Sequence, residues 1–130
     1  MLIETGLTGR SETMVTEQNT AAAVGSGLVP VFATPCMVAL MENAAAGAVL
    51  PVLAPDEGTV GTHLDVSHTS ATPIGMKVWA VATLTAVDGK KLTFDVTAYD
   101  QAGEIGRGTH ERFIIRPEKF LARCQAKLGE

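Results

Sequence analysis

Residues 34–50 read TPCMVALMENAAAGAVL, and this stretch decides the fold class. Thr34 followed by Pro35 is typical of a helix start, with the threonine as N-cap and the proline at the first helical position. The residues that follow are almost all apolar or small, and Pro51 ends the run. Because a helix that is apolar on every side is buried all round, we expect a central helix covered on all its faces.

After this helix the hydrophobic period changes to two, which is typical of strands. We predict three long antiparallel strands and a fourth after them, over 59–68, 77–86, 91–99 and 104–115. The Asp-Gly dipeptide at 88–89 predicts a type I′ hairpin turn. On the first strand, the alternation assigns these residues to the face toward the helix: Val60, Thr62, Leu64, Val66 and His68.

The remaining segments are shorter and complete the fold. Residues 1–17 predict one or two strands, 18–30 a loop with at most one helical turn, and 117–128 a short amphipathic helix. One buried helix and several antiparallel strands give an α+β fold, a curved sheet wrapped around a central helix. A chain of 130 residues is one domain, which we place at 1–130. Two such sheets would pair edge to edge in a homodimer, which removes an exposed edge.

Composition narrows the functional classes. There are 10 Lys and Arg against 14 Asp and Glu, a net charge of −4, so the basic footprint of a nucleic-acid-binding protein is missing. Hydrophobic residues reach 46%, which indicates a globular domain with some apolar surface covered by a partner subunit. The N-terminus lacks the pattern of a signal peptide, and no unbroken apolar run reaches the roughly 18 residues of a membrane span. We expect a cytoplasmic protein with no membrane contact.

Cysteine and metal-ligand spacings predict neither a disulfide nor a resident metal. Cys36 and Cys124 lie far apart, as free thiols of a reducing compartment do. No cluster of His, Cys or Asp has the spacing of a metal site, and the sequence contains no glycine-rich phosphate loop. We therefore expect no metal and no cofactor.

Glu42 is the most informative residue, because a carboxylate within an apolar helix is costly to bury unpaired. Its role is either structural or functional. His68 ends the first strand on the helix side, where it is either a satisfied core residue or a general base paired with Glu42. Such a pair would place the pKa of His68 near or above its usual value of about 6.5. Thr34 is either a helix cap or a nucleophile beside that base.

Other polar residues have simpler interpretations. His110 and Arg112 alternate on the last strand and share one side, which we interpret as a solvated strand face or a salt bridge between subunits. His63 and Asp65 are interpreted as surface residues. Cys36 is interpreted as a small hydrophobic core residue rather than a nucleophile.

Three blocks of the chain, taken together, resemble the hot-dog-fold thioesterases of the fluoroacetyl-CoA thioesterase type. They read FATPCMVALMENAAAGAVL (32–50), GTVGTHLDVSHTSATPIG (58–75) and LTFDVTAYDQAGEIGRGTHERFII (92–115), within a resemblance that covers about residues 20–118. The resemblance implies a hot-dog fold, in which a curved antiparallel sheet wraps a long central helix. It also implies a homodimer, with a dimer of dimers as a further option.

The same resemblance implies hydrolysis of an acyl-CoA thioester to a carboxylic acid and free CoA. The catalytic set of the family matches Thr34, Glu42 and His68, with His68 as base for Thr34 or a water and Glu42 orienting it. Gly61 matches a glycine whose backbone N–H holds the thioester carbonyl, and Arg112 matches an arginine near a small acyl pocket. The contacts of the CoA phosphates stay open among four candidates: Lys77, Arg107, Arg112 and Lys119.

Two positions depart from the pattern of this family. Leu28 stands where a key phenylalanine of an aromatic lid would be, which argues against fluoroacetyl-CoA as the substrate. Pro35 replaces a glycine after the threonine and removes a backbone donor from the site. Both departures also suit an alternative, a non-catalytic hot-dog module that binds an acyl-CoA or another small ligand. A hydratase on the same fold is a third option, but its Asp and His pair has no match here.

Overall fold

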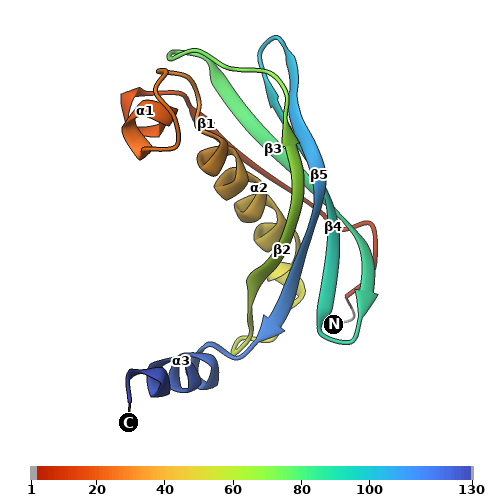
Figure 1. Cartoon of the computed structure of the whole chain (residues 1–130). Helices are drawn as coiled ribbons and strands as arrows, with labels where there is room; N and C mark the ends of the chain where they lie inside the picture. Colours follow the sequence, from red (N-terminus) through yellow and green to blue (C-terminus); the bar gives the residue numbers. More distant parts are fainter. Residues whose placement is uncertain (1–2, 130) are drawn as a thin grey trace.

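The computed structural model describes residues 3–129 and confirms the α+β fold class (Figure 1). One antiparallel sheet has the strand order β1-β3-β4-β5-β2. The strands are β1 (Thr8–Met14), β2 (Gly58–His68), β3 (Lys77–Asp88), β4 (Lys91–Asp100) and β5 (Gly103–Ile115). The helices are α1 (Ala21–Val24), α2 (Thr34–Val49) and α3 (Pro117–Gln125), with short 3-10 turns η1 (Glu17–Asn19), η2 (Leu50–Val52) and η3 (Ala126–Leu128).

The core lies between α2 and the concave face of the sheet (Figure 1). The helix packs mainly against β1 and β3 through one face, formed by Met37, Leu40, Met41, Ala44, Ala45, Ala48 and Val49. Small sheet residues such as Ala80, Ala82 and Ala98 are fully buried and let the helix lie close to the strands. By length and composition alone the run Thr34–Val52 could cross a membrane, but in this fold it supplies the core helix.

The opposite face of α2 is uncovered, so the expected burial on every side is wrong for a single chain. Its exposed residues are Thr34, Pro35, Ala39, Asn43 and Gly47. The strand β2 lies at the sheet edge and, among the described residues, pairs only with β5. Figure 1 shows α1 and α3 beyond the two ends of α2, on the side away from the sheet. An open helix face and an open sheet edge are thus both available to a partner.

A β-bulge at Thr62 shifts the alternation in β2. The register of the β2–β5 pairing changes between Gly61 and His63, so Thr62 is the extra residue. Gly61 therefore faces α2, as its close approach to the helix shows. The prediction that Val60 and Thr62 face the helix is wrong, because the bulge moves the first part of the strand by one position.

The β3–β4 turn lies one residue later than predicted. Asp88 pairs with Lys91, so Gly89 and Lys90 form the two-residue loop. Gly89 has a φ of +63°, and none of the described non-glycine residues has a positive φ. A type I′ turn requires positive φ at both loop positions, so the predicted turn type is also wrong. Lys90 is exposed at the tip of this hairpin.

The other predicted segments agree with the structure within a few residues. Within 3–17 the structure has one strand, β1, and the expected helical turn within 18–30 is α1. The expected C-terminal helix is α3 followed by η3. The part of the first predicted segment at residues 1–2 lies outside the described residues.

Candidate active site

The end of β2 and the start of α2 meet at a hydrogen bond. Thr34 Oγ1 lies 2.7 Å from His68 Nδ1. The expected N-cap role of Thr34 is wrong, because Ala33 occupies the cap position and Thr34 is already the first residue of the helix. Its hydroxyl is therefore available to the imidazole, with Pro35 following it in the first turn.

The imidazole of His68 is half-buried, and this decides its charge. Burial lowers the pKa of His68 below its usual 6.5, and the nearby backbone of Ser70 raises it by less. The expected rise of this pKa is wrong for a single chain, because no carboxylate within residues 3–129 bonds to the ring. His68 Nε2 is buried and has no hydrogen-bond partner among the described residues. The neutral form, which accepts protons, is favoured.

A cavity of about 280 Å³ opens beside the Thr34–His68 pair. One wall is the segment from α1 to Phe32, and the other is the chain just after β2. Several lining residues are small, namely Ala21, Ser26, Ser70 and Ala71. Leu28, at the lid position, is 96% exposed and does not line this cavity. The space beside the pair therefore suits a small group.

Glu42 belongs to a second polar cluster, farther along α2. Its Oε2 lies 3.4 Å from Arg112 Nη1. Arg112 Nε donates to Thr59 Oγ1 at 2.8 Å, and Nη2 donates to the Thr59 carbonyl at 3.1 Å. His110 Nδ1 lies 2.8 Å from the carbonyl oxygen of His63, and its Nε2 lies 3.1 Å from Arg112 Nη1. These partners fit a neutral His110 that donates through Nδ1 and accepts from Arg112 through Nε2.

The predicted location of His110 and Arg112 on a solvated strand face is wrong. They are 0% and 7% exposed, because their strand positions lie opposite inward-facing residues of β2. Burial is the main cause that lowers the pKa of His110, and the charge of Arg112 adds to it. Alternation correctly put both residues on one side, but no sequence signal said which side. Thr59, which holds the guanidinium, was missed for the same reason.

Gly61 is the point where Glu42 reaches the sheet. A Cβ at this position would overlap Glu42 Oε2 and would lie 3.1 Å from His110 Cε1 and 3.3 Å from Arg112 Nη1. Only a glycine leaves room for the carboxylate between these groups. The expected site residue Gly61 is thus in direct contact with two others, Glu42 and Arg112.

Within one chain the structure does not bring Glu42 to His68. Thr34 and Glu42 are eight residues apart on α2, about 12 Å at 1.5 Å per residue. Gly61 and His68 are seven residues apart on β2, roughly 23 Å at 3.3 Å per residue. Residues 3–129 of a single chain therefore contain two half-sites, the Thr34–His68 pair and the Glu42–Arg112–Gly61 cluster. Among these residues no group of His, Cys, Asp and Glu could hold a metal ion.

Several known proteins that this chain resembles are thioesterases. Residues 15–118 match the fluoroacetyl-CoA-specific thioesterase family, FlK. The fluoroacetyl-CoA thioesterase of Streptantibioticus cattleyicolor is 50% identical over 97 residues, which are 75% of this chain and 70% of that protein. A solved structure of the fluoroacetyl-CoA thioesterase FlK has 38% identity and a TM-score of 0.92, with 98% of each chain covered. A thioesterase superfamily member from Thermus thermophilus has 32% identity and a TM-score of 0.88, covering 96% of this chain and 93% of that one. These similarities confirm the expected hot-dog fold.

Proposed function

The chain belongs to the family of fluoroacetyl-CoA-specific thioesterases and is a thioester hydrolase, and on this premise we propose that it cleaves small acyl-CoA thioesters to a carboxylic acid and free CoA. The observation that carries this proposal is the 2.7 Å hydrogen bond between Thr34 and His68 beside a cavity of about 280 Å³. A cavity of this size, lined largely by small side chains, suits a short acyl group. The family membership favours this function over the non-catalytic module.

In the proposed reaction His68 is the general base. Its neutral Nδ1 takes a proton from the Thr34 hydroxyl, or from a water held there, as that oxygen attacks the thioester carbonyl carbon. The C–S bond then breaks, and the imidazolium returns the proton to the CoA thiolate. If Thr34 carries the acyl group, a water attacks the ester carbonyl as His68 takes its proton, the ester C–O bond breaks, and the imidazolium returns the proton to the Thr34 oxygen. Both routes end in a carboxylic acid and free CoA.

We further propose a homodimer in which two β2 edges pair. A two-fold axis perpendicular to the sheet makes the β2 strands antiparallel and keeps both α2 helices on one side. The uncovered face of α2 and the open β2 edge support this assembly. With the axis near His63, Gly61 of one chain lies closer to His68 of the partner subunit than to its own His68.

The dimer would join the two half-sites into one. The partner's Glu42 would then orient the imidazole through His68 Nε2, the atom that lacks a partner in the single chain. The Glu42 side chain is 37% exposed in one chain, so part of it remains accessible to a neighbour. The N–H of Gly61 and the guanidinium of Arg112 would stabilise the thioester oxygen as negative charge develops on it.

At Leu28 this chain differs from the lid pattern of its family, and this bears on the identity of the acyl group. The Streptantibioticus cattleyicolor relative is named for fluoroacetyl-CoA. Leu28, where the family lid carries an aromatic residue, is 96% exposed and does not contact the cavity. We therefore propose a small acyl group other than fluoroacetyl for this enzyme.

A thiol-release assay over short, branched and aromatic acyl-CoAs tests the function. For Thr34→Ala, His68→Ala and Glu42→Gln we expect kcat to fall at least about a hundredfold while acyl-CoA binding persists. Thr13→Ala, which changes an exposed threonine on β1, serves as the control and should keep full activity. A wild-type protein that binds acyl-CoA but releases no thiol from any thioester would instead be the non-catalytic module.

Mixing two inactive variants tests the shared site. A mixed dimer of His68→Ala and Glu42→Gln chains contains one intact site if the half-sites come from different subunits. Random mixing then restores roughly a quarter of the wild-type rate. No recovery in a mixture shown to exchange subunits would place both half-sites in one chain and contradict the shared arrangement.

A further inference from the structure

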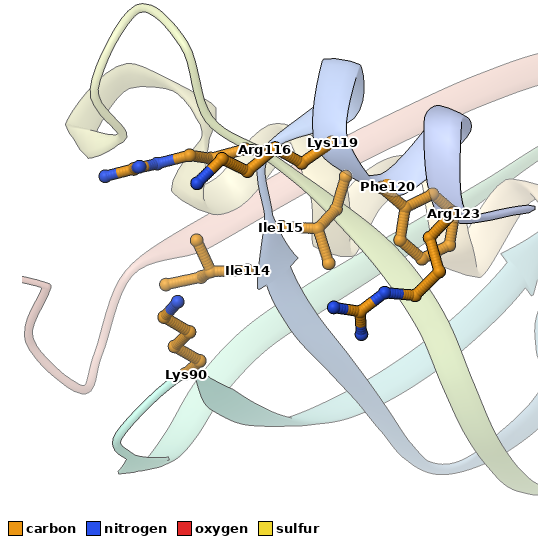
Figure 2. Close-up of a pocket in the computed structure, with 7 residues that line it drawn as sticks. All are labelled: Lys90, Ile114, Ile115, Arg116, Lys119, Phe120 and Arg123. Atoms are coloured by element: carbon orange, nitrogen blue, oxygen red, sulfur yellow. The ribbon is translucent and has the colours of Figure 1, made fainter.

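Four cationic side chains have no carboxylate partner within residues 3–129, and three of them line one cavity. Of the 10 Lys and Arg, the following form ion pairs: Arg10, Lys77, Lys91, Arg107, Arg112 and Arg116. The others are Lys90, Lys119, Arg123 and Lys127. The first three of these line a cavity of about 320 Å³ between α3, the end of β5 and the β3–β4 turn (Figure 2).

This cavity, which we term the basic pocket, combines positive charge with an apolar wall. Figure 2 shows Lys90 extending from the turn toward Ile114, while Phe120 and Arg123 extend from α3 toward Ile115. The Phe120 ring is 43% exposed, and none of the described residues that line the pocket is acidic. Such a pocket fits a ligand with several negative charges and a flat aromatic group.

A fourth cation that lines the basic pocket, Arg116, forms only a weak ion pair outside it. Arg116 Nε lies 3.7 Å from Asp56 Oδ2, and both side chains are more than half exposed. An exposed ion pair of this length contributes little to stability, so the guanidinium can turn to a stronger anion. With Arg116 the pocket offers four cations to a ligand, in a chain whose overall charge is −4.

We propose that the basic pocket binds the 3′-phosphoadenosine diphosphate end of coenzyme A, an inference that rests on the proposed thioesterase function. The cations pair with the 3′-phosphate and the diphosphate, and Phe120 stacks on the adenine. Of the four contacts left open by the sequence, Lys77, Arg107 and Arg112 form ion pairs and do not line the basic pocket. Lys119 is the one that is free, and it lines this pocket.

The basic pocket serves the reacting centre of the partner subunit. On β5, Ile115 pairs with Gly58 and Gly106 pairs with His68. The pocket is therefore about ten residues along β2 from its own His68, roughly 33 Å at 3.3 Å per residue. In the antiparallel pairing proposed above, the Gly58 end of one β2 strand lies beside the His68 end of the other. The CoA moiety thus spans the subunit interface.

Steady-state kinetics on acyl-CoA and on the same acyl group carried by pantetheine test this inference. For Lys119→Ala and for Arg123→Ala we expect KM for acyl-CoA to rise about tenfold with kcat unchanged, the loss of one charge-assisted contact. KM for acyl-pantetheine, which lacks the nucleotide, should not move. Lys127→Ala is the matched control, because it removes the same charge from the same terminal segment outside the pocket.

The outcomes separate this inference from the thioesterase proposal. Hydrolysis of acyl-pantetheine by the wild type would show thioesterase activity independently of any nucleotide binding in the pocket. An equal rise of KM for both substrates, or an equal rise in Lys127→Ala, would overturn the nucleotide site. Free ADP that binds the pocket without competing with acyl-CoA would make it an independent nucleotide site and would also overturn the inference.

Mixed dimers test which subunit supplies the pocket. A double variant that carries both Lys119→Ala and Arg123→Ala is mixed with the Thr34→Ala variant. In a mixed dimer, a site with low KM forms only if the nucleotide pocket and Thr34 come from different subunits. We expect a component with wild-type KM to appear on mixing. Its absence, in a mixture shown to exchange subunits, would overturn the assignment to the partner.

Discussion

At the scale of the residue, Thr34 shows what a motif can and cannot predict. The Thr-Pro pair correctly marked the start of α2, but the cap is decided by the backbone, and Ala33 adopts the extended φ of −75° and ψ of 139°. The bond from Thr34 to His68 joins residues 34 apart in the chain, which local spacing cannot reveal. The sequence offered Thr34 either as a cap or as a neighbour of His68, and the fold was needed to decide between the two. Of the residues in the basic pocket the sequence offered only Lys119, because it could not show that Lys90, Arg116 and Arg123 lie beside it in the fold.

The pH dependence of kcat/KM tests the surroundings of His68. Without a carboxylate neighbour, burial lowers the pKa of His68 below 6.5, so the activity that remains in Glu42→Gln should fall further as the pH drops through a midpoint below 6.5. The base is neutral above that midpoint, which gives the direction of the loss. In the proposed dimer of the wild type, the carboxylate of the partner's Glu42 should move the midpoint upward. Identical midpoints in the two proteins would show that Glu42 does not reach His68.

Gly61→Ala tests the contact between β2 and Glu42. The new Cβ would overlap the end of the Glu42 side chain, which can move, so we expect folding to survive with a loss of about 1–3 kcal/mol. The displaced carboxylate leaves Arg112, and kcat should fall by about a hundredfold. Gly58→Ala on the same strand is the control, since its Cβ meets only an ordinary contact of 3.6 Å with Pro117. Urea unfolding and thiol release give the two readouts, and an active Gly61→Ala would contradict this role of the contact.

At the scale of the element, β2 shows where alternation fails. Hydrophobic period located this strand within one residue of its observed start, but a bulge leaves no signature in the sequence. The extra residue Thr62 puts Gly61 on the inner face, opposite Arg112. The sequence could therefore predict the strand and not the inward face of its first half. The same bulge brings the Glu42 cluster together.

Deleting Thr62 tests whether the bulge positions Arg112 against Glu42. The deletion leaves Gly61 and Leu64 on the same inner face, so the sheet should form with little loss of stability. The added twist of the bulge is lost, and kcat should fall by at least about tenfold as Arg112 moves from Glu42. The matched control deletes Thr85, the extra residue of the bulge in β3, away from the site. Equal activity in the two deletions, measured by thiol release, would argue against a special role for Thr62.

At the scale of the whole molecule, the exposed apolar side chains lie mostly outside the open face of α2. Large apolar side chains that one chain leaves exposed include Leu28, Leu64 and Leu121, whereas the exposed residues of α2 are small or polar, and Ala39 alone among them is counted in the 46%. Composition predicted that a partner covers apolar surface, but it could not say which face stays open, because α2 is apolar nearly all round. The sheet decides this by packing against one side only.

Ala39→Glu tests whether that open face lies in the dimer interface. Ala39 is exposed in one chain, so a monomer should accept the charge with little change in stability. In the proposed dimer the same carboxylate would be buried without a partner, which costs several kcal/mol and should dissociate the subunits. Sedimentation equilibrium should then show a dimer for the wild type and a monomer for Ala39→Glu.

The oligomeric state and the activity should change together, because each proposed site draws Thr34 and His68 from one chain and Glu42 from the other. Ala86→Glu, at an exposed alanine of β3, is the matched control and should remain dimeric and active. A wild-type protein that is monomeric while fully active would contradict the shared site. A monomeric Ala39→Glu with full activity would do the same, since a lone chain keeps its two half-sites apart.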